Sequence, residues 1–281
     1  MHRWNSRIIA SAHFFSVRIV ISVPGIKVGV QLSSFGQPFK KALLTAASLK
    51  VDSIEIDART ELRPSEVSGT ALRQIRKMLS DLNLRIVAVR FQTRRGYDCP
   101  DELDRRVAAT KDVMKMTGDL GARVVVNQIG QIPESSDDAS HEMLRSVLSD
   151  LGRFAQHHGA FLGCETGSEP LSHVLKLIDA LPEGSLGVTL NPGNLIANGY
   201  DLNDLRSIAQ HVLLVHAKDA IQDRAKGRGM DVPLGRGLAE FPEIAAILEE
   251  RRFNGAYVID REASKTSFAE VELAVQFLRN L

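Results

Sequence analysis

Four polar residues that end apolar runs could together do chemistry. Glu165 follows the run GAFLGC (159–164), and Asn191, His216 and Asp260 stand at comparable positions in VTLN, LLVHAKD and YVIDRE. Carboxylate, amide and imidazole groups are ligands for divalent cations such as Mn²⁺, Mg²⁺, Zn²⁺ and Co²⁺. Each residue taken alone is more simply a hydrogen-bonded strand end. A metal site therefore requires a fold that brings the four together.

Short runs rich in Val and Ile alternate with amphipathic stretches from residue 26 onward. The runs lie at 26–32, 51–57, 84–91, 122–130, 160–166, 185–190, 211–219 and 255–262. They lack strict polar alternation, which is typical of strands buried on both faces of a parallel sheet. The stretches 38–49, 70–82, 141–158, 171–181, 202–209, 241–252 and 267–280 carry apolar residues at helical spacing. This alternation predicts a single (β/α)8 TIM barrel. An open doubly wound sheet is the alternative, but no G-x-G-x-x-G follows the first run.

A barrel of this kind would direct the four polar residues to one place. Active sites of such barrels lie at the C-terminal ends of the strands. Because successive side chains of a strand alternate between its faces, His216 shares a face with Leu214, and Asp260 shares one with Val258. We therefore expect four successive strands to bring together Glu165, Asn191, His216 and Asp260.

Further polar groups near the strand ends are candidates for substrate binding. These are Arg90, Asn127, Gln128, Lys218, Glu262, Arg228 and Arg236. Lys218 could equally pair with Asp219, and Glu55 and Asp57 favour supporting or ion-pair roles. The stretch 220–237 is long for a loop after a strand, which indicates either a lid or binding element or a mobile solvated loop. Its basic residues, with Arg94 and Arg95 in the loop 92–98, suit a phosphate or a carboxylate.

Several motifs resemble one family in matching order. CETG, GVTLNPGNL, VHAKD, VPLGRG followed by FPEIAAIL, and GAYVIDRE resemble the xylose-isomerase-like TIM barrels, a superfamily that contains the sugar phosphate isomerases and epimerases, over residues 26–281. The resemblance implies a small polyhydroxylated substrate and a metal held by Glu165, Asn191, His216 and Asp260. Two positions depart from the family pattern, because Asn191 replaces an aspartate and Asp260 replaces a glutamate. Asn191 removes one negative charge, and Asp260 is shorter by one bond.

The resemblance also implies a reaction, the isomerisation or epimerisation of a sugar, sugar phosphate or sugar acid. A proton beside a carbonyl would be removed through an enediolate, whose charge a cation stabilises. Glu165 and Asp260 would then lie on opposite sides of the substrate carbon, one removing the proton and the other returning it. Two alternatives remain open. Both carboxylates could be ligands only, or the barrel could have lost its metal and bind a sugar or a protein partner without catalysis.

Composition excludes several other classes of function. The 281 residues carry a formal net charge of +1, which gives no general attraction to nucleic acid. An apurinic-site DNA endonuclease on the same fold would need several histidines at the barrel mouth, whereas only His216 falls at a predicted strand end. No run is long enough to cross a membrane.

The chain divides into an N-terminal extension, 1–24, and a barrel domain, 25–281. The extension starts basic and turns apolar, but His13 and Arg18 interrupt it, which argues against a signal peptide. Cys99 and Cys164 are the only cysteines, which favours a reducing compartment, and we expect a cytoplasmic protein. A homo-oligomer is compatible with the sequence.

Overall fold

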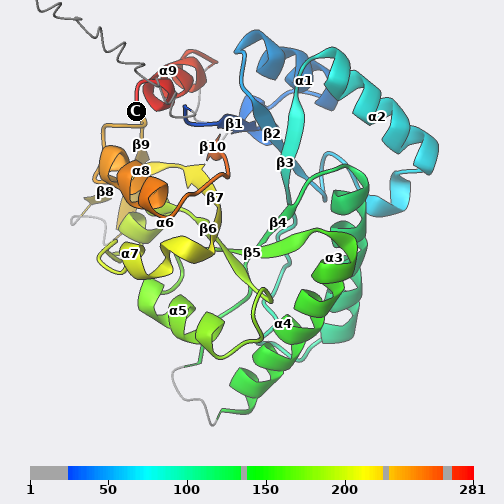
Figure 1. Ribbon diagram of the computed structural model, residues 1–281, viewed down its shortest axis with the longest axis vertical. Coiled ribbons are helices and arrows are strands. Elements are labelled where there is room, and N and C mark those ends of the chain that lie inside the picture. Colours follow the sequence, from blue (N-terminus) through cyan, green and yellow to red (C-terminus); the bar gives the residue numbers. More distant parts are fainter. Residues whose placement is uncertain (1–24, 134–137, 224–227, 262–267) are drawn as a thin grey trace, which may run out of the picture.

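The computed structural model describes residues 25–133, 138–223, 228–261 and 268–281, so the extension 1–24 lies outside the described residues. Eight parallel strands close into a barrel, which confirms the predicted (β/α)8 architecture (Figure 1). Around the barrel the strands are β1 (Val28–Gln31), β2 (Ser53–Asp57), β3 (Arg85–Arg90), β4 (Val124–Asn127), β5 (Phe161–Glu165), β6 (Gly187–Leu190), β7 (Val212–Ala217) and β10 (Tyr257–Ile259).

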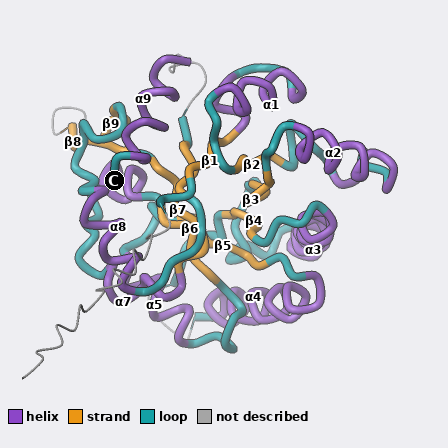
Figure 2. Tube along the Cα trace, turned by 45° about the horizontal axis from the view of Figure 1, so that its top comes forward, coloured by secondary structure: helices purple, strands orange, loops and turns teal. Residues whose placement is uncertain are grey.

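Helices form a ring outside the strands (Figure 2). The α-helices are α1 (Phe39–Ser48), α2 (Gly69–Asp81), α3 (Leu103–Asp119), α4 (Ala139–His158), α5 (Leu171–Asp179), α6 (Pro192–Ala197), α7 (Leu205–Ile208), α8 (Phe241–Glu250) and α9 (Phe268–Arg279). Short 3₁₀ turns are η1 (Leu32–Phe35), η2 (Pro64–Glu66) and η3 (Ala209–His211). Side chains cap the two longest helices of the expected set, since Ser68 accepts from the N–H of Ala71 at the start of α2 and Asp138 accepts from the N–H of Ser140 at the start of α4.

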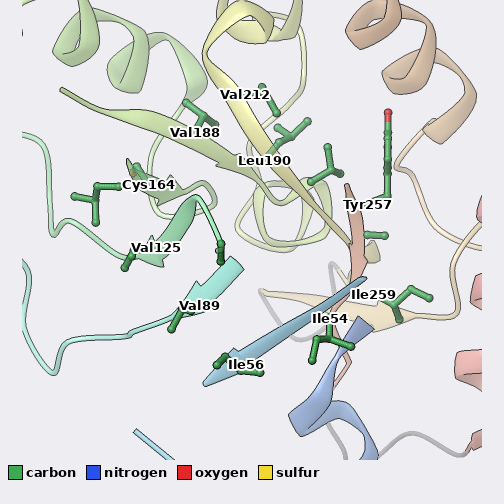
Figure 3. Packing of buried hydrophobic residues seen from close by; sticks show 14 of the residues in the cluster. Ile54, Ile56, Val89, Val125, Cys164, Val188, Leu190, Val212, Tyr257 and Ile259 are labelled. Carbon is green, nitrogen blue, oxygen red and sulfur yellow. The ribbon is translucent and has the colours of Figure 1, made fainter. Parts of the chain in front are cut away.

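Alternation along the strands divides the apolar side chains into two clusters. One set, which includes Ile54, Ile56, Val89, Val125 and Ile259, points outward from the strands and packs against the helices (Figure 3). The smaller set fills the barrel interior and consists of Ala88, Val124, Val126, Leu214, Ala256 and Val258. The strands are buried on both faces, as their continuous apolar runs predict.

The stretch after β7 is not the irregular loop that its glycines and charges indicated. Strands β8 (Asp219–Asp223) and β9 (Arg228–Val232) pair antiparallel, with Ile221 opposite Met230. The interpretation of 220–237 as a loop is therefore wrong over these two strands. Residues 224–227 between them lie outside the described part of the chain.

Asp219 fixes the segment that follows this hairpin. Its carboxylate is buried and accepts backbone N–H groups from Ala220, Gly235, Gly237 and Ala239 at 2.9–3.0 Å. A Cβ at position 237 would lie 2.1 Å from Asp219 Oδ1, so only glycine fits there. The VPLGRG motif is thus a turn built around one carboxylate.

Candidate metal centre

Polar side chains form a layer above the apolar interior of the barrel. His216 lies two residues beyond Leu214 on β7, and Asp260 lies two residues beyond Val258 of β10, so both continue the inward-facing side of their strands. Glu165 ends β5, and Glu55 lies within β2. All four side chains are buried, with exposed fractions from 0% to 9%. The expected convergence therefore occurs for Glu165, His216 and Asp260, and Glu55 joins them.

His216 lies between two carboxylates. Its Nε2 is 2.9 Å from Glu55 Oε2, and its Nδ1 is 2.9 Å from Glu165 Oε1. Asp260 Oδ2 is 3.9 Å from the same Nδ1. Burial opposes a charge on the imidazole, but Glu55 and Glu165 outweigh it and hold the pKa of His216 well above its ordinary value.

Glu165 is held by several donors. Oε1 accepts a hydrogen bond from Asn191 Nδ2 at 2.9 Å as well as facing His216, and Oε2 accepts from Gln92 Nε2 at 2.8 Å. Arg90 Nη2 lies 3.8 Å from Oε2. Burial alone would raise the pKa of Glu165, but His216, Arg90 and Asn191 overcome that effect and lower it to about 2. Glu165 is consequently an ionised carboxylate in a fixed orientation.

Asp260 has a different environment from Glu165. It makes no hydrogen bond to another residue that the structure describes, and 9% of its surface is exposed. Burial raises its pKa, helped by the charge of Glu165, and the opposing effects of His216, Arg90 and Lys218 do not cancel the rise. The two acids of the cluster are thus shifted in opposite directions.

The donor atoms of this cluster suit a divalent cation. One oxygen each from Glu165 and Asp260 and one nitrogen of His216 all lie within 4.8 Å of one another. Because Nε2 faces Glu55, a neutral imidazole with its proton on Nε2 directs the Nδ1 lone pair toward both acids. Two carboxylates and one imidazole fit Mn²⁺, Zn²⁺, Co²⁺ or Mg²⁺.

Asn191 lies beside the cluster, but its amide oxygen points elsewhere. The oxygen accepts from the N–H of Asn194 at 3.0 Å and caps α6, while the amide nitrogen donates to Glu165. Reversing the amide would place its nitrogen against an N–H and its oxygen against a carboxylate. The two contacts together fix its orientation. In this arrangement Asn191 orients Glu165 and does not offer an oxygen to the ion.

The expected substrate-binding residues are distributed unevenly. Arg90 lies at the cluster. Gln128, the residue after β4, is exposed and follows Val126 on the same face of the strand. Asn127 points to the opposite side, where it is buried and donates to the hydroxyl of Tyr97 at 3.1 Å.

The remaining expected residues belong to the hairpin and the segments around it. Lys218 pairs with Asp231 at 3.1 Å and not with Asp219, whose oxygens are taken by backbone N–H groups. Arg236 is exposed in the turn after β9. Glu262 and the side chain of Arg228 lie outside the described residues.

Sequence reasoning missed one residue of the site, Gln92, and did not specify the partner of another, Glu55. Gln92 contacts Glu165 directly, although it was only one residue of the loop after β3. Glu55 was expected in a supporting role, and its contact with His216 makes that role specific. The sequence indicated this role, because Glu55 is a carboxylate near the end of a buried strand, two residues beyond Ser53 and therefore on the same strand face.

Comparisons with known proteins agree with the barrel fold. Residues 43–281 match the model of the xylose isomerase-like TIM barrel family. No curated protein matches the chain. A solved xylose isomerase domain protein from Planctomyces limnophilus is similar, with 23% identity, a TM-score of 0.79, and coverage of 92% of this chain and 97% of that one.

Two further solved structures share the fold. A xylose isomerase-like TIM barrel protein from Mycobacterium smegmatis, in complex with magnesium, has 15% identity and a TM-score of 0.73, covering 91% of this chain and 96% of that one. D-psicose 3-epimerase in the presence of D-fructose has 14% identity and a TM-score of 0.67, covering 90% and 96%. At these identities the likeness shows the fold alone. In the described part of this chain, no helix is long and apolar enough to cross a membrane.

Proposed function

Because the chain belongs to the xylose isomerase-like TIM barrel family, we propose that it is a divalent-metal-dependent isomerase or epimerase of a small sugar, sugar phosphate or sugar acid. The reaction is removal of a proton beside a carbonyl, through an enediolate of the substrate. One observation carries the proposal, namely the buried cluster of Glu165, His216 and Asp260 with its three donor atoms within 4.8 Å. Solved proteins of the same fold include one with magnesium and an epimerase with D-fructose, which supports both the metal and the substrate class.

A divalent cation in the cluster would supply positive charge to substrate oxygens while the neighbouring carbon loses its proton. Residues of the chain prepare that position. Glu55 holds the Nε2 side of His216 and so directs Nδ1 toward Glu165 and Asp260. Asn191 and Gln92 hold the Glu165 carboxylate from two sides. Such supporting contacts raise metal affinity by about 10–100-fold.

Asp260 is the group best suited to move a proton. Its raised pKa brings it nearer to neutral pH, and it is not tied by a hydrogen bond to another described residue. Glu165, with a pKa of about 2, accepts a proton poorly until its donors are rearranged. We therefore assign Asp260 the main proton transfer, and Glu165 the partner role on the opposite side of the substrate carbon as well as metal binding.

Two buried polar atoms beside the cluster suit substrate hydroxyl groups. Gln92 Oε1 and Arg90 Nε are buried and have no hydrogen-bond partner among the described residues. Leaving such atoms unpaired is costly, so a ligand that satisfies them gains affinity. Gln92 Oε1 would accept a hydrogen bond from a substrate hydroxyl, and Arg90 Nε would donate one to a substrate oxygen. A polyhydroxylated substrate offers both.

A metal-free binding barrel is the second candidate. Both ring nitrogens of His216 face carboxylates, and the Asn191 oxygen caps α6, so a proton on His216 balances part of the acidic charge without an ion. In that case the barrel would bind a sugar or a protein partner without turning it over. Metal titration separates the two candidates, because the enzyme must bind Mn²⁺, Mg²⁺, Zn²⁺ or Co²⁺ at the cluster.

Solvent-deuterium exchange tests the proposed reaction. Purified protein is freed of metal with a chelator, reloaded with each cation, and incubated in D₂O with a panel of aldoses, ketoses, their phosphates and sugar acids. We expect metal-dependent deuterium incorporation beside the carbonyl of at least one compound. Glu165→Gln should abolish the incorporation although the protein remains folded at the assay temperature, and Glu66→Gln, an exposed charge on η2, serves as the control. Incorporation by Glu165→Gln at the wild-type rate would remove Glu165 from the mechanism.

Three expectations remain predictions. These are the domain boundary at residue 25, the cytoplasmic location and a homo-oligomeric state.

A further inference from the structure

A cavity rich in arginine is lined by residues on both sides of Gln92, the residue that donates to Glu165. It has a volume of about 630 Å³, within the range of small-molecule sites. Its walls come from the segment after β2, the segment after β3 and the first turns of α3. Five arginines line it, namely Arg59, Arg94, Arg95, Arg105 and Arg106. Arg105, Arg106 and Ala109 of α3 reach it from one helical face.

Three of these guanidinium groups have no carboxylate partner among the described residues. Arg59 donates to the backbone carbonyl of Gln92 at 2.6 Å, and Arg106 donates to the backbone carbonyls of Cys99 and Asp101. Arg94 makes no hydrogen bond or ion pair within the described part of the chain. Carbonyl groups orient a guanidinium but do not neutralise it. The cavity therefore carries positive charge that an anion would balance.

The other two arginines are only weakly compensated. Arg95 pairs with Asp101, and Arg105 lies 3.3 Å from Glu102. All four of these side chains are more than half exposed, where ion pairs contribute little. In addition, Arg106 Nε is buried without a partner. Several donors are thus ready for an anion at one place.

Gln92 joins this cavity to the metal cluster. Its side chain donates to Glu165, and its backbone carbonyl holds Arg59. Thr93 and Arg94, the next two residues, already line the cavity. One to two residues of extended chain span about 3–7 Å. The carbon chain of a pentose or hexose, with bonds of about 1.5 Å, covers a similar distance.

We propose that this arginine cavity binds the phosphate group of a phosphorylated sugar whose carbonyl end lies at Glu165 and Asp260. The proposal rests on the proposed function and names its substrate class. Guanidinium groups bind phosphate oxygens through paired, charge-assisted hydrogen bonds, and several of them match a dianion better than a single negative charge. The hairpin and turn residues Arg228 and Arg236, favoured on sequence, are not needed for this role.

Two measurements test the proposal. In the first, deuterium exchange is compared for a sugar phosphate, the parent sugar and the corresponding uronic acid, with wild-type protein and Arg94→Gln. We expect wild type to prefer the phosphate ester by at least about 100-fold in kcat/KM, and Arg94→Gln to reduce that preference about 10–100-fold, mainly through KM. Arg73→Gln, an exposed arginine of α2 outside the cavity, is the matched control and should keep the wild-type preference.

The second measurement needs no catalysis. Binding of inorganic phosphate is followed by ³¹P line broadening, and Arg94→Gln should weaken it about tenfold while Arg73→Gln does not. Unchanged preference and unchanged phosphate binding in Arg94→Gln would overturn the proposal and leave the isomerase function standing. Preference for the uronic acid would also overturn it. Weakened phosphate binding without exchange on any compound would retain the anion site but refute the proposed sugar chemistry.

Discussion

Asn191→Asp probes the contact between β5 and β6 most sharply. The change places a second carboxylate 2.9 Å from Glu165 Oε1, where an amide nitrogen now donates. The cap on α6 is retained, because an aspartate oxygen still accepts from the N–H of Asn194. The variant therefore isolates one pair of charges.

The magnitude follows from the distance. Two unit charges 2.9 Å apart repel by about 6 kcal/mol at an effective dielectric constant of about 20. Protonation of one acid limits this cost, since a pKa shift of two units corresponds to about 3 kcal/mol. Without metal, we expect a loss of about 2–4 kcal/mol in the free energy of unfolding. For a chain of this size that lowers the unfolding temperature by about 5–10 °C.

A bound cation should reverse part of this loss. The positive charge of the cation relieves the repulsion between the two carboxylates, and the introduced carboxylate adds a further negative charge beside the cation. Mn²⁺ should therefore raise the unfolding temperature of Asn191→Asp more than that of wild type. The assay is thermal unfolding in chelator and in excess Mn²⁺. Asn198→Asp is the matched control, because Asn198 also donates to an oxygen, the carbonyl of Gly167 at 2.8 Å, but it has no contact with Glu165. It should be destabilised equally with and without metal.

Two results would refute this reasoning. Wild-type stability of Asn191→Asp in chelator would mean that its side chain does not face Glu165. Equal metal-induced shifts in wild type and Asn191→Asp would mean that no cation lies next to this pair. The control separates a general cost of the extra charge from a cost specific to the site.

Three further predictions test other parts of the structure. Because the pKa of His216 is held well above its ordinary value, Mn²⁺ binding at pH 7 should release about one proton per ion. Calorimetry in buffers of different ionisation enthalpy measures this release, and a release of zero would place the ion elsewhere. Burial raises the pKa of Glu61 to about 7, above its unfolded value, so ionisation of Glu61 destabilises the fold as pH rises from about 4.5 to 7. In denaturant titrations, the stability of Glu61→Gln relative to wild type should therefore increase across that pH range, by at most about 3 kcal/mol. A gain in stability that does not depend on pH would contradict this. Asp219→Asn should lower the free energy of unfolding by about 2–4 kcal/mol, because two backbone N–H groups lose their acceptor. The same change at the exposed Asp231 should lower it by less than about 1 kcal/mol. Equal losses would argue against the turn built on Asp219.

The barrel was predictable because two features of the sequence indicate its strands. Each run is apolar on both faces, and each is separated from the next by a stretch long enough to return the chain. Alternation then placed His216 and Asp260 on the inward faces of their strands, since two residues along a strand return the side chain to the same face. Two helices, α3 and α6, were not identified. The sequence of α3, LDRRVAATKDVMKMTGD, mixes charges among few large apolar residues, and α6, PGNLIA, is only six residues long.

Other features depend on contacts that a sequence does not express. The amide of Asn191 could have presented either atom to Glu165, and the N–H of Asn194 decides which one. The ring of His216 is oriented by Glu55, which lies 161 residues away in sequence. The β8–β9 hairpin was read as a loop because GRGM carries glycines and charges, and neither its pairing nor the four N–H groups around Asp219 follows from periodicity.

The proposed function depends on the binding of one divalent cation by Glu165, His216 and Asp260. The most direct measurement is anomalous diffraction from crystals grown with Mn²⁺. We expect a single anomalous peak within about 2.0–2.4 Å of His216 Nδ1 and of one oxygen from each of the two acids. The absence of such a peak at saturating Mn²⁺, or a peak that contacts none of the three side chains, would contradict metal binding at this cluster.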